Sequence, residues 1–218
     1  AMCAKVGLDV VCAPVLDLRL PGAHDVIGDR ALSEDPVEVA RLGSAWIAGL
    51  HAAGAQSVIK HIPGHGRALA DSHHELPRVT ASAAELAADI APFRALAGSG
   101  AWAMTAHVLY EAWDRMLPAT ISPVVIRDII RGEIGFEGVL VTDDLAMGAL
   151  AGASNDLAGA ALVAGCDLAL HCTGRLADTA ALLADCPPLT DRAAERLAQA
   201  RGMTEAFHGR RPEALRAL

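Results

Sequence analysis

The amino-acid sequence predicts an α/β fold with a parallel sheet, of the (β/α)8 TIM-barrel type. Short apolar stretches alternate with helical patterns along the chain, and within the stretches polar and apolar residues do not alternate cleanly. This is typical of parallel strands that are buried on both faces. Chemically capable side chains follow the stretches, and an active site built at the carboxyl ends of successive strands is typical of this barrel.

Five stretches rich in Val, Ile and Leu are the predicted strands. They cover residues 8–16, 57–62, 101–108, 137–143 and 166–171. The side chains at their ends are Asp17, Lys60 and His61, His107, Asp143 and Asp144, and His171 and Cys172. A doubly wound sheet is the alternative, but neither G-x-G-x-x-G after the first strand nor G-x-x-x-x-G-K-[ST] is present, which disfavours its nucleotide-binding versions.

Helices are predicted between and after these strands. They cover residues 36–53, 82–97, 123–131, 155–165, 175–185 and 190–207. Two of them begin with an N-cap residue before a proline, at Asp35-Pro36 and at Ser122-Pro123, and Thr190 or Asp191 can cap the last.

The strand count is too small for a complete barrel, which needs eight strands and about 250 residues. Either about three strands are absent at the amino end or the fold is smaller, and the abrupt opening of the chain favours the first interpretation. We therefore expect one N-terminally truncated catalytic domain over residues 1–218 that supplies about the last five strands. The polar segment 203–218 is expected to be a frayed tail.

Composition disfavours several classes of protein. The net charge of -8, without a Lys/Arg cluster, predicts no nucleic-acid partner. No uncharged apolar run reaches the roughly 18 to 20 residues that span a bilayer, so no membrane association is expected. The absence of a secretory signal favours a cytoplasmic location. Five cysteines without C-x-x-C spacing, mostly in apolar surroundings, predict reduced, buried thiols.

The segment KHIPGHGRALADSHHELP (60–77) has three interpretations. The first is a metal site, because four histidines and Asp71 are suitable ligand types. Their spacing is not that of ligands on one helix and H-x-H is absent, so neither a metal nor a cofactor is predicted. The second is an ordinary polar loop. Against this, Lys60 and His61 close an apolar strand, where charged groups must pair or face a site.

The third interpretation is proton chemistry by Asp71-Ser72-His73. One intervening residue lets two side chains turn toward the same side in an extended segment. Asp71 can then accept the imidazole N–H of His73, fix its tautomer and raise the basicity of the other nitrogen. This spacing is a weak signal by itself.

Six segments carry a family resemblance that covers most of the chain. They are LDVVCAPVLDL (8–18), IGDRALSEDP (27–36), VIKHIPGHGRALADSHHELP (58–77), AMTAHVLY (103–110), GFEGVLVTDDLAMGA (135–149) and AGCDLALHC (164–172). In this order and at these spacings they resemble the bacterial β-N-acetylglucosaminidases of glycoside hydrolase family 3.

The resemblance implies a retaining exo-β-N-acetylglucosaminidase, a glycoside hydrolase that removes terminal non-reducing N-acetylglucosamine (GlcNAc) from β-linked substrates. Anhydro-muropeptides of cytoplasmic peptidoglycan recycling are the implied substrates. Asp143 would be the nucleophile that forms a glycosyl-enzyme. His73, held by Asp71, would be the acid/base. The implied sugar-binding residues are Arg30, Lys60 and His61.

Other residues and outcomes are weighed beside this assignment. His107 is expected to line the pocket and Asp144 to cap a helix, whereas no role is assigned to His24, His65, His74 or His171. The family's earlier strands, one of which ends in an Asp-Gln-Glu-Gly-Gly-Arg stretch, have no counterpart, so we expect a fragment of a longer protein. The alternatives are a phosphorylase-type enzyme that transfers the sugar to phosphate, and a non-catalytic sugar-binding remnant.

Overall fold

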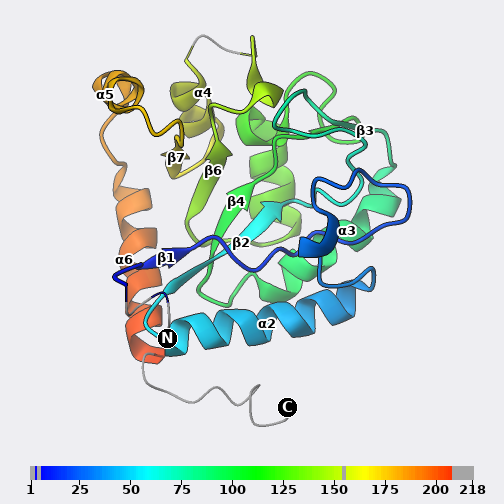
Figure 1. Ribbon diagram of the computed structural model, residues 1–218, viewed down its shortest axis with the longest axis horizontal. Coiled ribbons are helices and arrows are strands. Elements are labelled where there is room, and N and C mark those ends of the chain that lie inside the picture. The colour runs from blue at the N-terminus through cyan, green and yellow to red at the C-terminus, as the bar shows by residue number, and fades with distance from the viewer. Residues whose placement is uncertain (1–2, 4–5, 154–155, 208–218) are drawn as a thin grey trace.

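The central sheet has five parallel strands in the order β1-β2-β4-β6-β7. The strands are β1 (Val10–Val11), β2 (Gln56–Ile62), β4 (Trp102–Thr105), β6 (Leu140–Asp144) and β7 (Leu168–Leu170). The computed structural model describes residues 3, 6–153 and 156–207 (Figure 1). Strand order in the sheet follows order in the chain, and one strand lies in each predicted stretch. The predicted parallel α/β sheet is thus confirmed.

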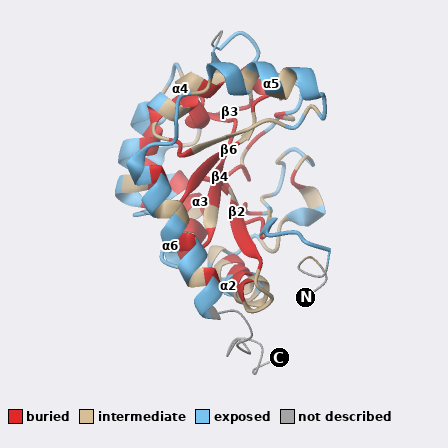
Figure 2. Cartoon of the chain, turned by 90° about the vertical axis from the view of Figure 1, so that its left-hand side faces the viewer, coloured by how far each residue is buried: buried red, intermediate tan, exposed pale blue. Residues whose placement is uncertain are grey.

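Helices connect the strands, and most of them gather on one face of the sheet, whereas α5 (Leu176–Asp185) lies at its upper end (Figure 2). They are α2 (Pro36–Ala52), α3 (Ala83–Leu96), the π-helical η3 (Val125–Glu133), α4 (Leu157–Ala164), α5 (Leu176–Asp185) and α6 (Asp191–Phe207). The predicted caps are present, because Asp35 accepts a hydrogen bond from Val37 N at 2.9 Å and Ser122 Oγ accepts one from Val125 N at 3.1 Å. In the part of the chain that the structure describes, no helix has both the length and the apolar character needed to cross a bilayer.

The main hydrophobic core lies between the sheet and these helices. Ile59 of β2 and Phe93 of α3 are completely buried in it, and full burial of such a side chain contributes about 1.5 to 3 kcal/mol. A second cluster on the sheet contains Val58, Met104 and Val141. Since successive strand residues point to opposite faces, Val58 and Ile59 belong to different clusters. Both faces of the sheet are therefore apolar, which explains why polar and apolar residues do not alternate in the sequence.

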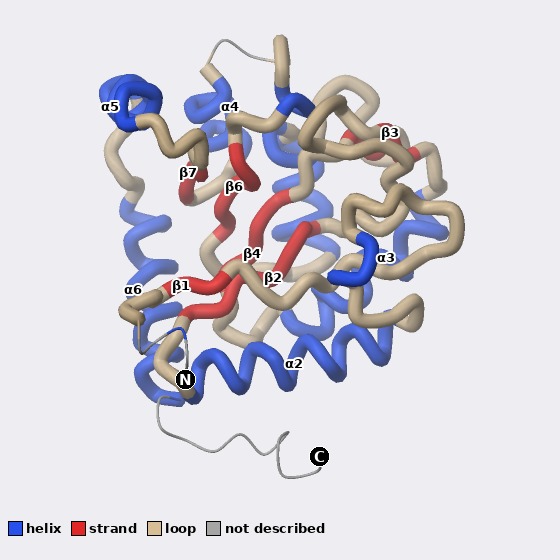
Figure 3. Tube along the Cα trace, in the orientation of Figure 1, coloured by secondary structure: helices blue, strands red, loops and turns tan. Residues whose placement is uncertain are grey.

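The loops that follow the strands gather beyond the carboxyl ends of β2 and β4 (Figure 3). Within them lies a two-stranded parallel sheet of β3 (Arg78–Val79) and β5 (Leu109–Tyr110). The sequence analysis did not predict this sheet, because two-residue strands are too short to show a period. The hydroxyl of Tyr110 donates to the carbonyl of Gly64 at 2.8 Å. This bond ties the small sheet to the loop that follows β2.

The first strand is shorter than the predicted 8–16. Only Val10–Val11 form a continuous ladder with β2, and Val15 adds one isolated bridge to Lys60. Pro14 has no N–H to donate to a ladder, although its carbonyl accepts from Lys60 N at 3.2 Å. The segment therefore follows β2 to its carboxyl end with interrupted pairing.

The prediction of a frayed tail is wrong for residues 203–207. Helix α6 continues to Phe207. The buried hydroxyl of Thr204 donates to Gln56 Oε1 at 2.7 Å, which fastens this part of the helix to the start of β2. The rest of the predicted tail, 208–218, lies outside the described residues.

The five cysteines are free thiols, as predicted, but their predicted burial is mostly wrong. Cys166 is buried, whereas Cys12 and Cys172 are exposed. Cys12 directly follows β1 and Cys172 lies shortly after β7, the two edge strands of the sheet. An apolar sequence neighbourhood does not bury a side chain where the sheet ends.

Candidate active site

Asp17 is a completely buried carboxylate beside the carboxyl end of β2. Its Oδ2 lies 2.6 Å from His61 Nδ1, and its Oδ1 accepts hydrogen bonds from the backbone N–H groups of His61 at 3.1 Å and His65 at 2.7 Å. Burial acts to raise the pKa of Asp17, but the charges and hydrogen bonds of the two histidines outweigh it and hold this pKa below its usual value. Asp17 is therefore an ionised acceptor that orients both histidines.

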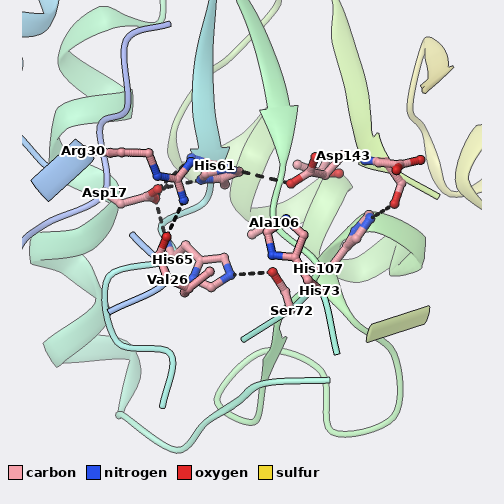
Figure 4. A network of polar contacts seen from close by, with 12 residues as sticks. Asp17, Val26, Arg30, His61, His65, Ser72, His73, Ala106, His107 and Asp143 are labelled. Atoms are coloured by element: carbon pink, nitrogen blue, oxygen red, sulfur yellow. Dashed lines mark hydrogen bonds and ion pairs between the residues drawn. The ribbon is translucent and has the colours of Figure 1, made fainter. Parts of the chain in front are cut away.

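His61 lies between two carboxylates at the end of β2 (Figure 4). Its Nδ1 donates to Asp17, and its Nε2 lies 3.7 Å from Oδ2 of Asp143. Lys60 lines the same cavity as His61. A regular strand points successive side chains to opposite faces, but the pairing of β2 with β4 is irregular between Lys60 and Ile62. This irregularity allows two consecutive side chains to reach one site.

Asp143 and Asp144 end strand β6 and have different surroundings. Asp143 Oδ1 accepts from the backbone N–H of Asp144 at 2.8 Å, and its side chain keeps 19% of its surface exposed. Asp144 Oδ1 accepts from the backbone N–H groups of Ala146 at 3.1 Å and Cys172 at 2.9 Å. Asp144 thus fastens the turn after β6 to the end of β7, and does not cap a helix as expected. Asp143 keeps its second oxygen toward the cavity.

Asp71 and His73 form the predicted pair. Asp71 Oδ1 lies 2.7 Å from His73 Nδ1 and accepts the backbone N–H of His73 at 2.9 Å. The backbone hydrogen bond is the main cause that holds the pKa of Asp71 below its usual value, and the side-chain hydrogen bond adds to it. The His73 side chain is 59% exposed. With Nδ1 directed to Asp71, Nε2 is the ring nitrogen that remains for a substrate.

These groups surround a cavity of about 110 Å³ at the carboxyl ends of the strands. The predicted site residues in its wall are Arg30, Lys60, His61, His73 and Asp143. Asp71 is not in the wall and holds His73 from behind. The guanidinium of Arg30 donates to the carbonyl of Val26 at 2.6 Å, which orients it. Among the residues that the structure describes, no three His, Cys, Asp or Glu side chains are grouped to hold a metal ion.

Three residues of the site were missed by the sequence analysis. They are Asp17, which was noted at a strand end but given no partner, and His65 and Ser72, which both line the cavity. His65 Nε2 lies 3.2 Å from Ser72 Oγ. Burial, and then the nearby charge of His61, lowers the pKa of His65 to about 4, so the ring is neutral at pH 7. No local pattern marks these residues, because the partners of Asp17 are 44 and 48 residues away and a spacing of seven residues within a loop does not predict the contact of His65 with Ser72.

His107 does not line the cavity, so the expectation for it is wrong. The side chain is buried, with Nδ1 2.7 Å from Thr120 Oγ1 and Nε2 3.0 Å from the carbonyl of Asp144. Burial lowers the pKa of His107. Because a carbonyl only accepts, the Nε2–H of the ring donates to Asp144. His107 therefore supports the backbone next to Asp143 from inside the protein.

Comparisons with known proteins identify relatives of this chain. The family model described as Glycosyl hydrolase family 3 N terminal domain matches residues 1–198. A β-hexosaminidase of Alkalilimnicola ehrlichii is 46% identical over 197 residues, which are 88% of this chain and 56% of that protein. A β-hexosaminidase of Chromobacterium violaceum is 43% identical over 204 residues, 92% of this chain and 57% of that protein. The chain thus spans little more than half the length of these relatives.

Solved structures give the same result. The structure of NagZ from Neisseria gonorrhoeae in complex with N-trifluoroacetyl-D-glucosamine has a TM-score of 0.81 and 35% sequence identity, covering 99% of this chain and 64% of that one. A glycoside hydrolase family 3 β-N-acetylglucosaminidase from Paenibacillus has a TM-score of 0.77 and 36% identity, covering 94% of this chain and 40% of that one. The matched family model, the relatives and the shared fold together establish that this chain belongs to glycosyl hydrolase family 3.

Proposed function

We propose that this chain carries the catalytic residues of a retaining exo-β-N-acetylglucosaminidase, with Asp143 as nucleophile and His73, paired with Asp71, as acid/base. The observation that carries the proposal is that Asp143, at the end of β6, and His73, in the loop between β2 and β3, line one small cavity. Hydrolysis with retention needs a nucleophile below the anomeric carbon and a separate proton carrier at the leaving oxygen. The two side chains have the chemistry for these tasks.

In the first step, Oδ2 of Asp143 attacks the anomeric carbon while the bond to the leaving oxygen breaks. The other oxygen of Asp143 accepts the N–H of Asp144, so Oδ2 is the one that faces the cavity. His73 in its protonated form gives the Nε2 proton to the leaving oxygen. The carboxylate of Asp71 accepts the Nδ1–H and stabilises the charged ring before transfer.

In the second step, water attacks the anomeric carbon of the glycosyl-enzyme. His73 is now neutral and takes the proton of the water at Nε2, so the sugar hydroxyl forms and the carboxylate of Asp143 leaves. The free enzyme returns with His73 protonated. One histidine thus serves as acid in the first step and as base in the second.

The sugar is proposed to lie against Arg30, Lys60 and His61. Arg30 and Lys60 donate hydrogen bonds only, which suits the oxygen atoms of sugar hydroxyls and of an acetamido group. His61 presents its Nε2 edge to the cavity while Asp17 fixes the ring from the other side. The binding groups are therefore placed around Asp143.

Two observations support GlcNAc as the sugar. The relatives reported above are named β-hexosaminidases, and one solved relative holds N-trifluoroacetyl-D-glucosamine. Anhydro-muropeptides and a place in cytoplasmic peptidoglycan recycling are proposed from the resemblance to the bacterial family members. The GlcNAc residue at the non-reducing end of such a molecule is the part proposed to enter the cavity beside Asp143.

The test is hydrolysis of 4-nitrophenyl N-acetyl-β-glucosaminide, followed by proton NMR of the sugar that is released first. A β-anomer is the expected product, and an α-anomer would contradict Asp143 as nucleophile because it reports inversion. The reaction is repeated in phosphate and in phosphate-free buffer. Formation of a sugar phosphate would replace hydrolysis by phosphorolysis. Binding of GlcNAc without release of nitrophenol would leave only a sugar-binding function.

A further inference from the structure

Ser72 differs from its two neighbours in the loop, because Asp71 and His73 are partly exposed whereas only 4% of Ser72 is exposed. Its hydroxyl lies 3.2 Å from Nε2 of His65, which lies seven residues earlier in the same loop between β2 and β3. We propose that Ser72 and His65 form a latch that sets the position of His73 over Asp143. The proposal rests on the proposed function and adds two positioning residues to it.

The His65 side of the latch is fixed. The backbone N–H of His65 donates to the buried carboxylate of Asp17 at 2.7 Å. Nδ1 of His65 is buried and has no hydrogen-bond partner among the described residues. Since buried N–H groups without an acceptor are rare, the ring proton belongs on Nε2, where it is donated to Ser72 Oγ. Asp17 also holds His61, so the latch and the sugar-binding edge share one anchor.

The turn that carries His73 is bonded within itself. The carbonyl of Asp71 accepts from the backbone N–H groups of His74 at 3.0 Å and Glu75 at 3.1 Å, and the carboxylate of Asp71 holds His73. A turn with these internal bonds moves as a unit. Its place relative to Asp143 is then decided by the contacts that it makes with other elements.

A second contact joins the turn to the element that follows Asp143. The backbone N–H of Gly148 donates to the carbonyl of His73 at 3.0 Å, and that of Ala149 donates to the carbonyl of Ser72 at 3.1 Å. Gly148 and Ala149 belong to η4 (Gly148–Leu150), the 3-10 turn after β6. Ser72 is thus held from both sides, by His65 through its hydroxyl and by Ala149 through its carbonyl.

Gly148 leaves the space that this docking requires. A Cβ at this position would lie 2.6 Å from the carbonyl oxygen of His74 and 2.9 Å from that of His73. Both distances are too short for a carbon atom, and both oxygen atoms belong to the turn. An alanine here disfavours only the docked position of the turn. Gly148→Ala therefore tests the latch from the opposite side to Ser72→Ala.

The test is amide hydrogen exchange of the purified chain, read at Gly148 and Ala149. We expect exchange at both amides to become roughly tenfold faster in each variant. Ser72→Ala removes a hydrogen bond that holds the turn in place, and Gly148→Ala crowds the docked turn at a similar cost in free energy. The amide of Leu145, which donates to Leu170, should not change. Unchanged exchange at Gly148 and Ala149 in both variants would overturn the latch.

The matched controls are Ser44→Ala and Gly49→Ala on helix α2. Ser44 is exposed, and a Cβ at Gly49 would meet no atom within 4 Å. Both should keep the wild-type exchange rates. Combining Ser72→Ala with His65→Leu, which cannot donate to Ser72, should add little to either change alone, because the two residues share one contact. Fully additive effects would contradict a shared contact.

Kinetics separate the latch from the proposed function. If the latch positions His73, Ser72→Ala lowers kcat/KM more for alkyl glycosides, which need protonation of the leaving oxygen, than for 4-nitrophenyl glycosides. Equal losses for both would indicate a general structural role and would count against the latch. A wild-type chain that hydrolyses nothing, with exchange at Gly148 responding as expected, would refute the proposed function and leave the latch standing.

Discussion

Nδ1 of His61 lies 2.6 Å from Oδ2 of Asp17, and this contact turns the opposite edge of the imidazole toward Asp143, 3.7 Å away. The same carboxylate accepts the backbone N–H of His65. One buried charge therefore holds the end of β2, the ring that faces Asp143 and the start of the next loop. Asp17 itself does not line the cavity, and its effect on a substrate is indirect.

Asp17→Asn should destabilise the protein and weaken the site together. Asparagine has one acceptor oxygen, so at least one of the contacts with His61 and His65 is lost and the remaining polar groups stay buried. Hydrogen bonds to a charged group contribute about 1.5 to 3 kcal/mol, and we expect a loss of roughly 3 kcal/mol in the free energy of unfolding. Urea denaturation followed by circular dichroism measures it.

The control for this change is Asp185→Asn, at an exposed position at the end of α5. It removes the same charge from the chain and should alter stability by less than about 0.5 kcal/mol. Similar losses in the two variants would show that net charge, and not the buried contacts of Asp17, determines the effect.

Asp143→Asn should eliminate turnover of 4-nitrophenyl N-acetyl-β-glucosaminide, with a fall in kcat on the order of a thousandfold or more, because an amide is a poor nucleophile. The matched variant is Asp144→Asn. Its Oδ1 accepts two backbone N–H groups, and an amide oxygen can accept both, so most activity should remain. Loss of activity in the Asp144 variant alone would transfer the nucleophile to that residue.

His73→Ala should slow turnover according to the leaving group. For alkyl glycosides, whose oxygen must be protonated as it departs, we expect kcat to fall roughly 100- to 10,000-fold. For 4-nitrophenyl glycosides, formation of the glycosyl-enzyme should fall much less, which a burst of nitrophenol under rapid mixing reports. Equal losses of the first step for both substrates would count against His73 as the acid. His74→Ala, at an exposed neighbour, is the control.

Sequence reasoning found the parts of this site that follow local rules. Asp143 and Asp144 were located together because they end an apolar strand, and Asp71 with His73 because a spacing of two lets neighbouring side chains pair. The choice of Asp143 over Asp144 came from the family resemblance. The joint action of Asp17 and His61 could not be predicted, because 44 residues separate them and only the folded β1–β2 pairing brings them together.

Other contacts between loops were equally hidden. A glycine such as Gly148 marks a close approach only when its neighbour is known, and here the neighbour is a turn about 74 residues earlier. The helices were predicted well, since capping residues such as Asp35 and Ser122 act on the next few backbone N–H groups. The small β3–β5 sheet was missed because its strands are too short to have a period. Contacts between residues far apart in the sequence were therefore not predicted, whereas features that depend on neighbouring residues, such as helix caps, were.

The buried His65 should make the protein less stable in mild acid. Its pKa is lowered to about 4 by burial and by the charge of His61, whereas an unfolded histidine takes up its proton near pH 6.5. Between these values the unfolded chain binds more protons at this position than the folded chain, so stability falls as the pH falls. The loss from this residue is about 1.4 kcal/mol per pH unit at most, and it ends below the folded pKa.

The measurement is urea denaturation of the wild-type chain and of His65→Gln at pH 7, 6 and 5. Glutamine can still donate to Ser72 but does not titrate, so the wild type should lose about 1 kcal/mol more than the variant between pH 6 and 5. His51 and His107, whose pKa values burial also lowers, are present in both proteins and cancel in the difference. Asp17 is also present in both proteins, and a carboxylate with a lowered pKa stabilises the fold until the pH falls below the usual carboxyl range, so Asp17 does not alter the difference between pH 7 and 5. Parallel curves from pH 7 to 5 would therefore show that His65 accepts a proton in the folded protein as readily as in the unfolded chain.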